Sequence, residues 1–340
     1  MKLGVVIVTY NRIELLKECI ANCINQVLKF DKIFVINNAS TDGTTEFLNN
    51  LAYDNIMVIN SKENLGGSGG FYEGIKIALN YDLDYLLLID DDAILDANYN
   101  DEIAKHIKND KDIYAFSGTV MTDGKIQGEH RKHLKRGFKC LDSKEEEYKK
   151  EYFDYELSTF CGLYVSMEII KKIGLPEKDF FIWFDDTEYS LRILKYSKIR
   201  NINTAILNHK TKLVANAGFS WKSYYGLRNQ IVIIKKYYSK LVLIKNIFKM
   251  KKMILDGGYF NDTEYICKVA AYEKEQANIY LLTGKTELTE FSLDAIYECV
   301  LDEEEQETAC AGVIRERYWS KHGKVLVFHI ENGFYKKNVN

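Results

Sequence analysis

Residues 85–92 read Tyr-Leu-Leu-Leu-Ile-Asp-Asp-Asp, an apolar run that ends in three carboxylates. Five consecutive apolar residues predict a strand buried on both faces, as in a parallel sheet that helices cover on both sides. Three adjacent carboxylates repel one another unless a cation neutralises them, and hard oxygen ligands suit Mg²⁺ or Mn²⁺. Ligands of open α/β sheets gather at the carboxyl ends of strands, where this triplet lies. Taken alone, the triplet fits a metal site and a solvated acidic turn equally well.

Length and composition limit the class of protein. The chain has 340 residues, of which 46% are hydrophobic, so it can bury a large core in two domains. A formal net charge of −3 argues against nucleic-acid binding as a global property. The seven cysteines are scattered and form no Cys-x-x-Cys pair, which is typical of reduced thiols in the cytosol. With no signal-peptide pattern and no apolar run of the roughly 20 residues that span a bilayer, we expect a cytoplasmic protein, soluble or peripheral on the membrane.

Apolar periodicity predicts an alternation of strands and helices. Strands are expected at residues 3–8, 32–36, 56–59, 114–120, 160–166 and 206–210. Four helices are expected. One covers residues 14–27, one begins after Asp42, one follows the glycine-rich stretch and ends at Leu79, and one covers residues 98–109. This alternation is typical of a doubly wound α/β sheet. Residues 122–157, in contrast, are charged and irregular, so we expect an insertion or mobile loop on the surface there.

A glycine-rich stretch precedes the third predicted helix. Residues 64–71 read Asn-Leu-Gly-Gly-Ser-Gly-Gly-Phe. Glycines allow close backbone approach, and N–H groups at a helix start favour an anion, although a flexible connector has the same composition. The stretch matches neither the dinucleotide fingerprint nor the P-loop, so neither of those nucleotide sites is supported.

A second acidic cluster lies at residues 183–188, where Trp183 precedes Asp185, Asp186 and Glu188. Helix capping explains one carboxylate at the start of a helix, but not two side by side. A carboxylate in partly apolar surroundings is a candidate general base. His209 follows a predicted strand, and a lone histidine of this kind is more often structural than a ligand.

The C-terminal part has a different character. Aromatic and polar residues at positions 221–229 suit stacking on sugars and binding of phosphate, although an aromatic core seam is the commoner explanation. Residues 235–252 contain seven lysines among apolar residues, which predicts a basic helix that lies on an anionic membrane or packs on the first domain. Residues 262–282 are expected to form another helix, and residues 301–307 a solvated acidic helix face.

Five motifs follow one another in the order seen in glycosyltransferase family 2: residues 6–12 (Val-Ile-Val-Thr-Tyr-Asn-Arg), 37–44 (Asn-Asn-Ala-Ser-Thr-Asp-Gly-Thr), 64–67 (Asn-Leu-Gly-Gly), 90–92 (Asp-Asp-Asp) and 183–186 (Trp-Phe-Asp-Asp). The chain therefore resembles this family of nucleotide-sugar-dependent enzymes over approximately residues 3–229. The resemblance implies a GT-A-like doubly wound mixed sheet, the nucleotide-diphospho-sugar transferase fold. We expect this catalytic domain to span residues 1–230 and a mainly helical domain, facing a membrane or a partner, to span residues 231–340.

The resemblance also implies a set of donor-binding and metal-binding residues. The nucleotide and donor sugar would contact Thr9, Tyr10, Arg12, Asn37, Asn38, Asn64, Gly66, Gly67, Asp90 and Asp91. Asp90 and Asp92 would hold Mn²⁺ or Mg²⁺ and the ribose, with His209 as a further metal ligand. Most relatives carry Asp where Asn37 stands, and that carboxylate accepts the uracil N–H. An amide oxygen can still accept, so this position leaves uracil and thymine open.

For the chemistry, the resemblance implies an inverting transfer of a hexosyl group to a hydroxyl. Asp186 would be the base, with Asp185 and Glu188 binding the acceptor or positioning the base. The acceptor would be a growing cell-surface glycan or a lipid-linked sugar. The glycine-rich loop, the triplet, the Trp-Phe-Asp-Asp motif and the later histidine most resemble the galactofuranosyltransferase branch. This favours UDP-galactofuranose, with dTDP-rhamnose as the alternative donor.

Two rival classes remain. A magnesium-dependent phosphatase or nucleotidyltransferase could use the triplet, but the Asp-x-Asp-Gly-Thr context and a basic glycine-rich loop after the first strand are missing. A non-catalytic protein that binds a sugar nucleotide or a membrane surface is favoured only by the lysine-rich segment. The sequence leaves the oligomeric state open.

Overall fold

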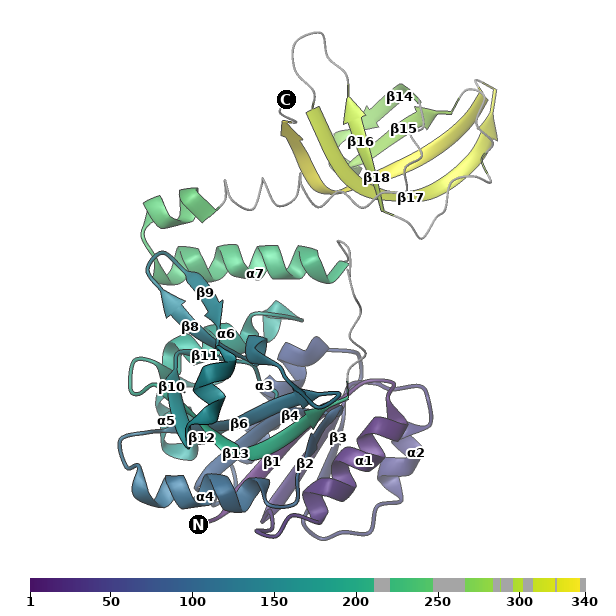
Figure 1. Ribbon diagram of the computed structural model, residues 1–340. Coiled ribbons are helices and arrows are strands. Elements are labelled where there is room, and N and C mark those ends of the chain that lie inside the picture. The colour runs from purple at the N-terminus through teal and green to yellow at the C-terminus, as the bar shows by residue number, and fades with distance from the viewer. Residues whose placement is uncertain are drawn as a thin grey trace. The chain divides into compact units, whose positions relative to one another are not determined.

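The computed structural model describes residues 1–210, 221–246, 267–283, 288, 296–301, 308–321 and 323–336 (Figure 1). Of these, residues 1–210 and 221–246 belong to one compact unit, and residues from 267 onward belong to a second. The border that we expect at residue 230 falls inside helix α7 (Trp221–Tyr237), which belongs entirely to the first unit.

The first unit is built on a mixed sheet, which has ten strands within the described residues. Its main order is β10-β13-β6-β12-β4-β1-β2-β3, with β5 beside β13 and β7 beside β6. Strands β3, β2, β1 and β4 are parallel, whereas β12 runs antiparallel to β4 and β6. The strands are β1 Leu3–Thr9, β2 Lys32–Asn37, β3 Ile56–Asn60, β4 Tyr85–Asp90, β5 Ala93–Leu95, β6 Ala115–Thr122, β7 Lys125–Ile126, β10 Tyr152–Tyr155, β12 Leu163–Ser166 and β13 Ile199–His209.

Helices cover both faces of this sheet because successive side chains of each strand point to opposite sides. Val5 and Ile7 face a core that α1, α2 and α4 complete, whereas Val6 and Val8 face a core that α3, α5 and α6 complete. The predicted doubly wound mixed α/β sheet is confirmed. The helices are α1 Ile13–Ile24, α2 Thr44–Asn49, α3 Gly66–Ala78, α4 Tyr99–Asn109, α5 Met167–Ile173 and α6 Asp185–Ile193.

The glycine-rich stretch forms the first turns of α3, where the sequence predicts a loop ahead of a helix. Glycines of α3, in this stretch and just after it, let the helix approach β1 closely. A Cβ on Gly70 would lie 2.5 Å from Val8 Cγ1, and one on Gly74 would lie 2.3 Å from Val6 Cγ1. Any larger residue at these two positions would push the helix off the strand.

Residues 122–157 are not the irregular loop that their charge predicts. They form β7, a 3-10 turn at Gly128–His130, β8 (Arg131–Lys135), β9 (Lys139–Asp142), a 3-10 turn at Glu145–Lys149 and β10. Strands β8 and β9 join β11 (Leu157–Ser158) in a separate three-stranded sheet. The prediction was wrong because the segment is anchored by a buried arginine, which a charge count assigns to the surface.

That arginine is Arg131, whose side chain is fully buried. Its guanidinium donates to the carbonyls of Gly118 (2.8 Å from Nη2), Cys161 (3.0 Å) and His130 (3.0 Å from Nη1). Nε also donates to Asn201 Oδ1 over 3.2 Å. These contacts tie the start of β8 to β6, β13 and the segment before β12.

The second unit differs from the mainly helical domain that the sequence predicts. Its described residues form a five-stranded antiparallel sheet in the order β14-β15-β18-β17-β16. The described part of the helix expected over residues 262–282 is a hairpin of strands instead. The second strand of this hairpin, β15, pairs with β18, which lies far along the chain. Apolar spacing within residues 262–282 does not reveal such a distant partner. The strands are β14 Lys268–Glu273, β15 Asn278–Leu282, β16 Ile296–Leu301, β17 Thr308–Ser320 and β18 Gly323–Lys336; residues 302–307 of the predicted acidic helix face lie outside the described residues.

Replacing the buried arginine should destabilise the first unit. We expect Arg131→Met to lower the free energy of unfolding by about 2–3 kcal/mol, because buried carbonyls lose charged donors. Urea denaturation followed by circular dichroism measures this change. The exposed Arg136, in the turn between β8 and β9, provides the control, and Arg136→Met should leave the midpoint nearly unchanged. Equal midpoints for both variants would contradict the structural role of Arg131.

Candidate active site

The acidic triplet lies where β4 ends beside β1, and neighbouring side chains hold two of its three carboxylates. Thr9 ends β1, and its Oγ1 donates to Asp91 Oδ2 over 2.7 Å. Arg12 precedes α1 and donates from Nη1 to Asp91 Oδ1 at 3.2 Å and to Asp92 Oδ2 at 2.7 Å. The structure thus places Thr9, Arg12, Asp91 and Asp92 in one network at the carboxyl edge of the sheet.

His209 closes this edge from the far side of the sheet. Strand β13 pairs with the short strand β5 so that His209 lies opposite Ala93, next to the triplet. His209 Nε2 is 3.3 Å from Asp92 Oδ1, and the Lys210 N–H donates to the Asp92 carbonyl over 2.8 Å. Neither the buried Asp92 Oδ1 nor the buried His209 Nδ1 has a hydrogen-bond partner among the described residues.

Asp92 Oδ1 and His209 Nε2 fit the requirements of a divalent cation. Two ligands at roughly 2.1 Å from one Mg²⁺, on perpendicular axes, are roughly 3 Å apart, close to the observed separation. Among the described residues, no group of three or more His, Cys, Asp or Glu is arranged to hold a metal ion. The donor set is therefore incomplete by itself, as expected where phosphates and water supply the remaining ligands of Mg²⁺.

Burial shapes the protonation of the triplet. Burial, followed by repulsion from Asp92 and Asp91, raises the pKa of Asp90 to about 7. Burial also raises the pKa of Asp91 to about 6, despite its bonds to Thr9 and Arg12. Burial alone would raise the pKa of Asp92, but His209 and Arg12 outweigh it and the pKa is lowered. Asp92 is thus the member of the triplet that stays ionised most readily.

The second acidic cluster begins α6, where Asp185 is buried and Asp186 is half-buried. Burial, followed by repulsion from Asp186, raises the pKa of Asp185 to about 8. The charge of Asp90 adds a smaller contribution to this rise in the pKa of Asp185. Burial raises the pKa of Asp186 to about 6. Asp186 Oδ1 accepts from the N–H of Thr187 at 2.5 Å, and no hydrogen bond from a described residue reaches its other oxygen.

Strained backbone leads into these two carboxylates. Phe181, Trp183 and Phe184 have φ angles of 63°, 64° and 69°, in the left-handed region that residues with side chains rarely adopt. Such strain gathers at ligand sites and is kept only where the surrounding contacts impose it. The Trp183 side chain, 46% exposed, lies at the surface beside the acids.

The glycine and asparagine candidates meet at the start of α3. Asn64 Oδ1 accepts from the Gly66 N–H at 2.9 Å, and Asn38 Nδ2 donates to the Gly66 carbonyl at 2.8 Å. Asn38 Oδ1 is buried and has no hydrogen-bond partner among the described residues. A Cβ on Gly67 would meet nothing within 4 Å, so this backbone borders open space.

Asn37 is already engaged in the protein. Its Nδ2 donates to Thr45 Oγ1 at 2.9 Å and to Asn60 Oδ1 at 2.8 Å, and its Oδ1 accepts from the Ser40 N–H at 3.1 Å. A carbonyl oxygen has two lone pairs, so one remains for a nucleobase. Tyr10 is 44% exposed.

Glu188 does not share the open side of the site. The side chain is fully buried; Oε1 accepts from Lys236 Nζ at 2.8 Å and from the Tyr237 hydroxyl at 2.6 Å. Oε2 accepts from Arg192 Nη2 at 2.5 Å. Both carboxylate oxygens of Glu188 accept hydrogen bonds from side chains of α6 and α7, which leaves neither oxygen for an acceptor sugar. Of the two roles expected for Glu188, this arrangement favours positioning of the base.

His130 is a further residue of the site, and it lies in residues 122–157, where the sequence predicts a surface loop. Its ring is perpendicular to that of His209, with centroids 5.1 Å apart, and its Nδ1 is 2.8 Å from Thr159 Oγ1. Burial, followed by the charge of Arg131, lowers its pKa to about 3, so the ring is neutral. Charge and periodicity hold no signal for such a residue, because its position depends on the burial of Arg131.

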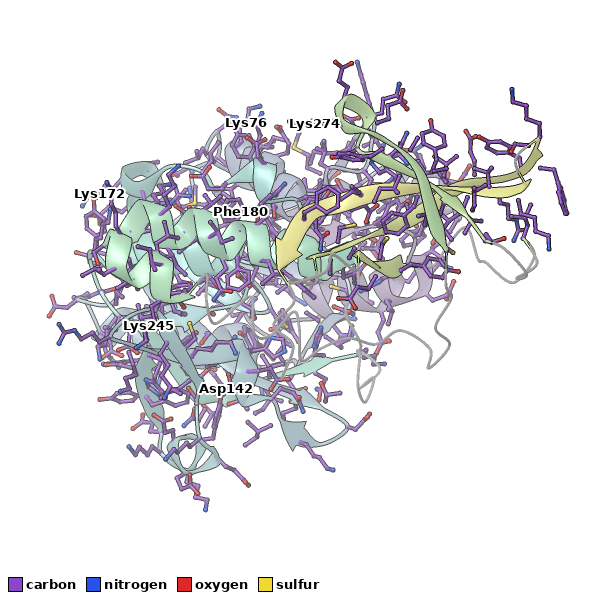
Figure 2. All side chains as sticks on the ribbon, turned by 90° about the horizontal axis from the view of Figure 1, so that it is seen from above. Lys76, Asp142, Lys172, Phe180, Lys245 and Lys274 are labelled. Atoms are coloured by element: carbon purple, nitrogen blue, oxygen red, sulfur yellow. The ribbon has the colours of Figure 1, made fainter. Side chains whose placement is uncertain are left out.

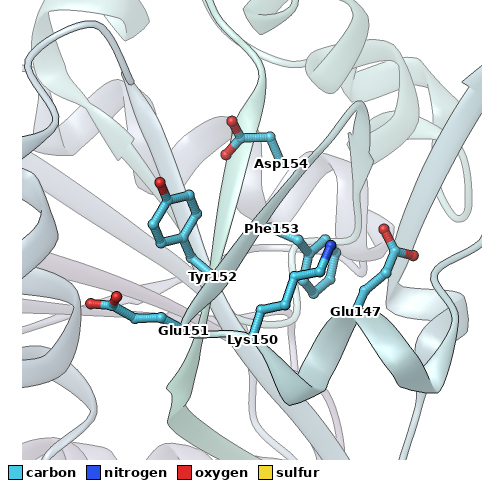
Figure 3. A pocket seen from close by; sticks show the side chains of 6 residues that line it. All are labelled: Glu147, Lys150, Glu151, Tyr152, Phe153 and Asp154. Carbon is cyan, nitrogen blue, oxygen red and sulfur yellow. The ribbon is translucent and has the colours of Figure 1, made fainter.

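A separate hollow lies at the β10 edge of the sheet, as Figure 3 shows. It contains none of the predicted site residues, and its acids are already paired. Asp154 accepts from Arg200 at 2.7 and 2.9 Å, and Glu147 lies 2.9 Å from His133 Nε2. We assign it no part in catalysis. Its lining residues are Glu147, Lys150, Glu151, Tyr152, Phe153 and Asp154.

Comparison with known proteins connects this geometry to a family. The sequence model described as Glycosyl transferase family 2 matches residues 4–174. A poly(ribitol-phosphate) beta-glucosyltransferase of Bacillus spizizenii is 34% identical over 97 residues, which is 27% of this chain and 15% of that protein. A poly-beta-1,6-N-acetyl-D-glucosamine synthase of Staphylococcus aureus is 29% identical over 112 residues, which is 32% of this chain and 26% of that protein. The match thus spans about a quarter or less of each relative.

Solved structures show the same fold at low sequence identity. GalNAc-T7, solved with UDP, GalNAc and Mn²⁺, aligns with a TM-score of 0.57 and 15% identity over 98% of this chain and 72% of that one. Residues 1–349 of S. aureus TarS, solved with UDP-GlcNAc, align with a TM-score of 0.52 and 15% identity over 68% of this chain and 65% of that one.

Binding of a divalent cation should require both Asp92 and His209. We expect Mn²⁺ to raise the melting temperature of the wild-type protein by several degrees, since a ligand at 100 times its Kd contributes about 2.7 kcal/mol. Asp92→Asn and His209→Ala should each abolish this rise, measured against the same variant without metal. Asp123→Asn, at an exposed turn with a φ of 51° that asparagine tolerates, should keep it. A rise retained in both site variants would rule out the cation site.

Proposed function

Because the chain belongs to glycosyl transferase family 2, we propose that it transfers a sugar from a nucleotide donor to a hydroxyl of a cell-surface glycan or lipid-linked acceptor, with inversion at the anomeric carbon. The observation that carries this proposal is the approach of His209 Nε2 to Asp92 Oδ1, 3.3 Å apart at the carboxyl edge of the sheet, where one cation could take both atoms as ligands. The charge of Asp90 adds to the raised pKa of Asp185, so the two acidic clusters influence each other electrostatically.

On the donor side, Asp92 and His209 would hold Mn²⁺ or Mg²⁺ against the diphosphate. The bound cation would supply the electrostatic stabilisation of the leaving nucleoside diphosphate. Arg12, whose side chain is 47% exposed, bridges Asp91 and Asp92 and can direct its remaining N–H donors toward phosphate oxygens. Thr9 donates to Asp91 and so holds this carboxylate at the end of β4.

On the acceptor side, Asp186 would remove the proton from the attacking hydroxyl. Its pKa of about 6 keeps it ionised at neutral pH yet makes it a stronger base than an exposed aspartate. Asp185, with a pKa of about 8, is protonated at pH 7 and can donate its proton in a hydrogen bond to the acceptor. The exposed Trp183 ring offers a flat apolar surface on which a sugar can stack.

The choice of donor sugar is drawn from the sequence resemblance and from the contacts of Asn37. The glycine-rich start of α3 favours UDP-galactofuranose by resemblance, whereas the relatives named above act with glucosyl and N-acetylglucosaminyl groups. Asn37 keeps one free lone pair for a base N–H, which serves uracil and thymine alike, so a dTDP-sugar stays the alternative. Nucleotide release from a panel of UDP- and dTDP-sugars with Mn²⁺ separates these donors.

Contact with an anionic membrane would involve the end of the helical segment after α7. Leu241 and Ile244 are 79% and 50% exposed beside Lys240 and Lys245, a combination that suits the interface of a bilayer. The part of the predicted basic segment from residue 247 onward lies outside the described residues. Among the residues that the structure does describe, no helix has both the length and the apolarity needed to cross a bilayer.

Removing the base should stop turnover and leave donor binding intact. We expect Asp186→Asn to lower kcat by about 10²–10⁴-fold, the usual contribution of general-base assistance. Donor binding, measured by calorimetry with the UDP-sugar and Mn²⁺, should change less than two-fold. Asp179→Asn is the matched control, because this exposed side chain lies in the same segment. Normal turnover in Asp186→Asn would mean that another group is the base.

The acid limb of the rate profile should report Asp186. Because only the ionised carboxylate accepts a proton, kcat at saturating donor should be halved near pH 6 and fall about tenfold per pH unit below it. Saturation is needed because Asp90 and Asp91 titrate in the same range and affect donor binding. A limb centred near pH 4 would contradict a buried base.

A further inference from the structure

The three residues with left-handed backbone before Asp185 need support from outside their own segment. Figure 2 labels Phe180, which begins this segment next to helix α7. The left-handed conformation of Phe181, Trp183 and Phe184 is costly for residues with a Cβ. The position of Asp185 and Asp186 therefore depends on whatever holds residues 180–184.

Asn229 of α7 holds this segment. Its side chain is fully buried, and Nδ2 lies 3.0 Å from the Phe180 carbonyl, 3.0 Å from that of Ile182 and 2.8 Å from that of Trp183. The two N–H hydrogens are shared among three carbonyls, so this position needs a donor, and the amide oxygen, which only accepts, cannot occupy it. Asn229 Oδ1 accepts from Arg228 Nε at 3.0 Å, which fixes the amide in this orientation.

The opposite side of the segment rests on α3. The Ser68 N–H donates to the Phe181 carbonyl over 3.2 Å, and a Cβ on Gly66 would lie 2.1 Å from that same oxygen. On the α7 side, a Cβ on Gly226 would lie 2.8 Å from Trp183 Cε3, so the indole ring lies directly on the helix backbone. The segment is clamped between two helices.

The same helix also holds the far side of the two acids. Glu188, in the first turn of α6, binds Lys236 and Tyr237, which lie two turns beyond Asn229 on α7. Seven residues of helix span about 10 Å, so one rigid element reaches both sides of Asp185 and Asp186. Helix α7 lies beyond the residues that the family model matches.

We infer that Asn229 and Glu188 are positioning residues for the base, acting from α7 on the two sides of Asp185–Asp186. This inference rests on the proposed function only in taking Asp186 as the base. Asn229 sets the path of the chain that enters α6, and Glu188 fixes the turn that follows. Neither group touches the donor side, where Asp92, His209 and Arg12 lie. Helix α7 thus supports the acids from one side, whereas α3, which carries the donor candidate Gly66, borders residues 180–184 on the other.

The test compares Asn229→Leu, which keeps the volume and loses the donors, with Gln230→Leu on the same helix as control. Asn229→Leu should lower kcat at least 100-fold while the Kd of UDP-sugar with Mn²⁺ changes less than two-fold. Glu188→Gln should lower kcat about tenfold with the same donor affinity, and it serves as the test if Asn229→Leu does not fold. Gln230→Leu should match the wild type in both values.

A spectroscopic readout separates positioning from a general loss of structure. In a background with Trp221→Phe and Trp319→Phe, emission comes from Trp183 alone, because the chain has three tryptophans. Asn229→Leu should shift this emission, and Gln230→Leu should not. Unchanged kcat in Asn229→Leu and Glu188→Gln, or a loss of donor affinity equal to the loss of kcat, would overturn the inference. Absence of transfer by the wild type would instead contradict the proposed function.

Discussion

The approach of Asp92 to His209 is the contact on which the site depends. It joins β4, at the centre of the sheet, to β13, near its edge, through the short pairing of β13 with β5. Without a cation, Arg12 and His209 share the charge of Asp92, and the pKa of His209 is raised because contact with Asp92 outweighs its burial. A bound cation would take the place of the imidazole proton and leave Arg12 as the partner of Asp91.

Asp185 and Asp186, at the start of α6, depend on burial and on the backbone segment before them. Asp185 and Asp186 are kept basic by burial, and their position is imposed by a strained segment that α3 and α7 clamp. In the proposed transfer, the fold would separate two tasks. The sheet edge would provide fixed charge for the leaving diphosphate, and the turn supported by α3 and α7 would provide a proton acceptor whose pKa is set by its surroundings.

The sequence predicts β1 to β4 and the helices between them, because each of these elements shows clear apolar periodicity and these four strands lie side by side in the sheet. Local patterns fail where partners are distant. The sequence predicts helices where the second unit has strands, and it predicts surface charge in the segment where Arg131 is buried. Within the site, the proximity of Asp92 and His209 was expected only from resemblance to a family. His130 and the pairing of Glu188 with α7 depend on tertiary contacts that carry no local signal.

The most direct measurement of the central claim is the electron spin-echo modulation of Mn²⁺ bound together with UDP. The account predicts modulation from a directly coordinated imidazole nitrogen, absent in His209→Ala, together with coupling to phosphorus from the diphosphate. Bound Mn²⁺ with phosphorus coupling but no nitrogen coupling in the wild-type protein would contradict the shared site of Asp92 and His209.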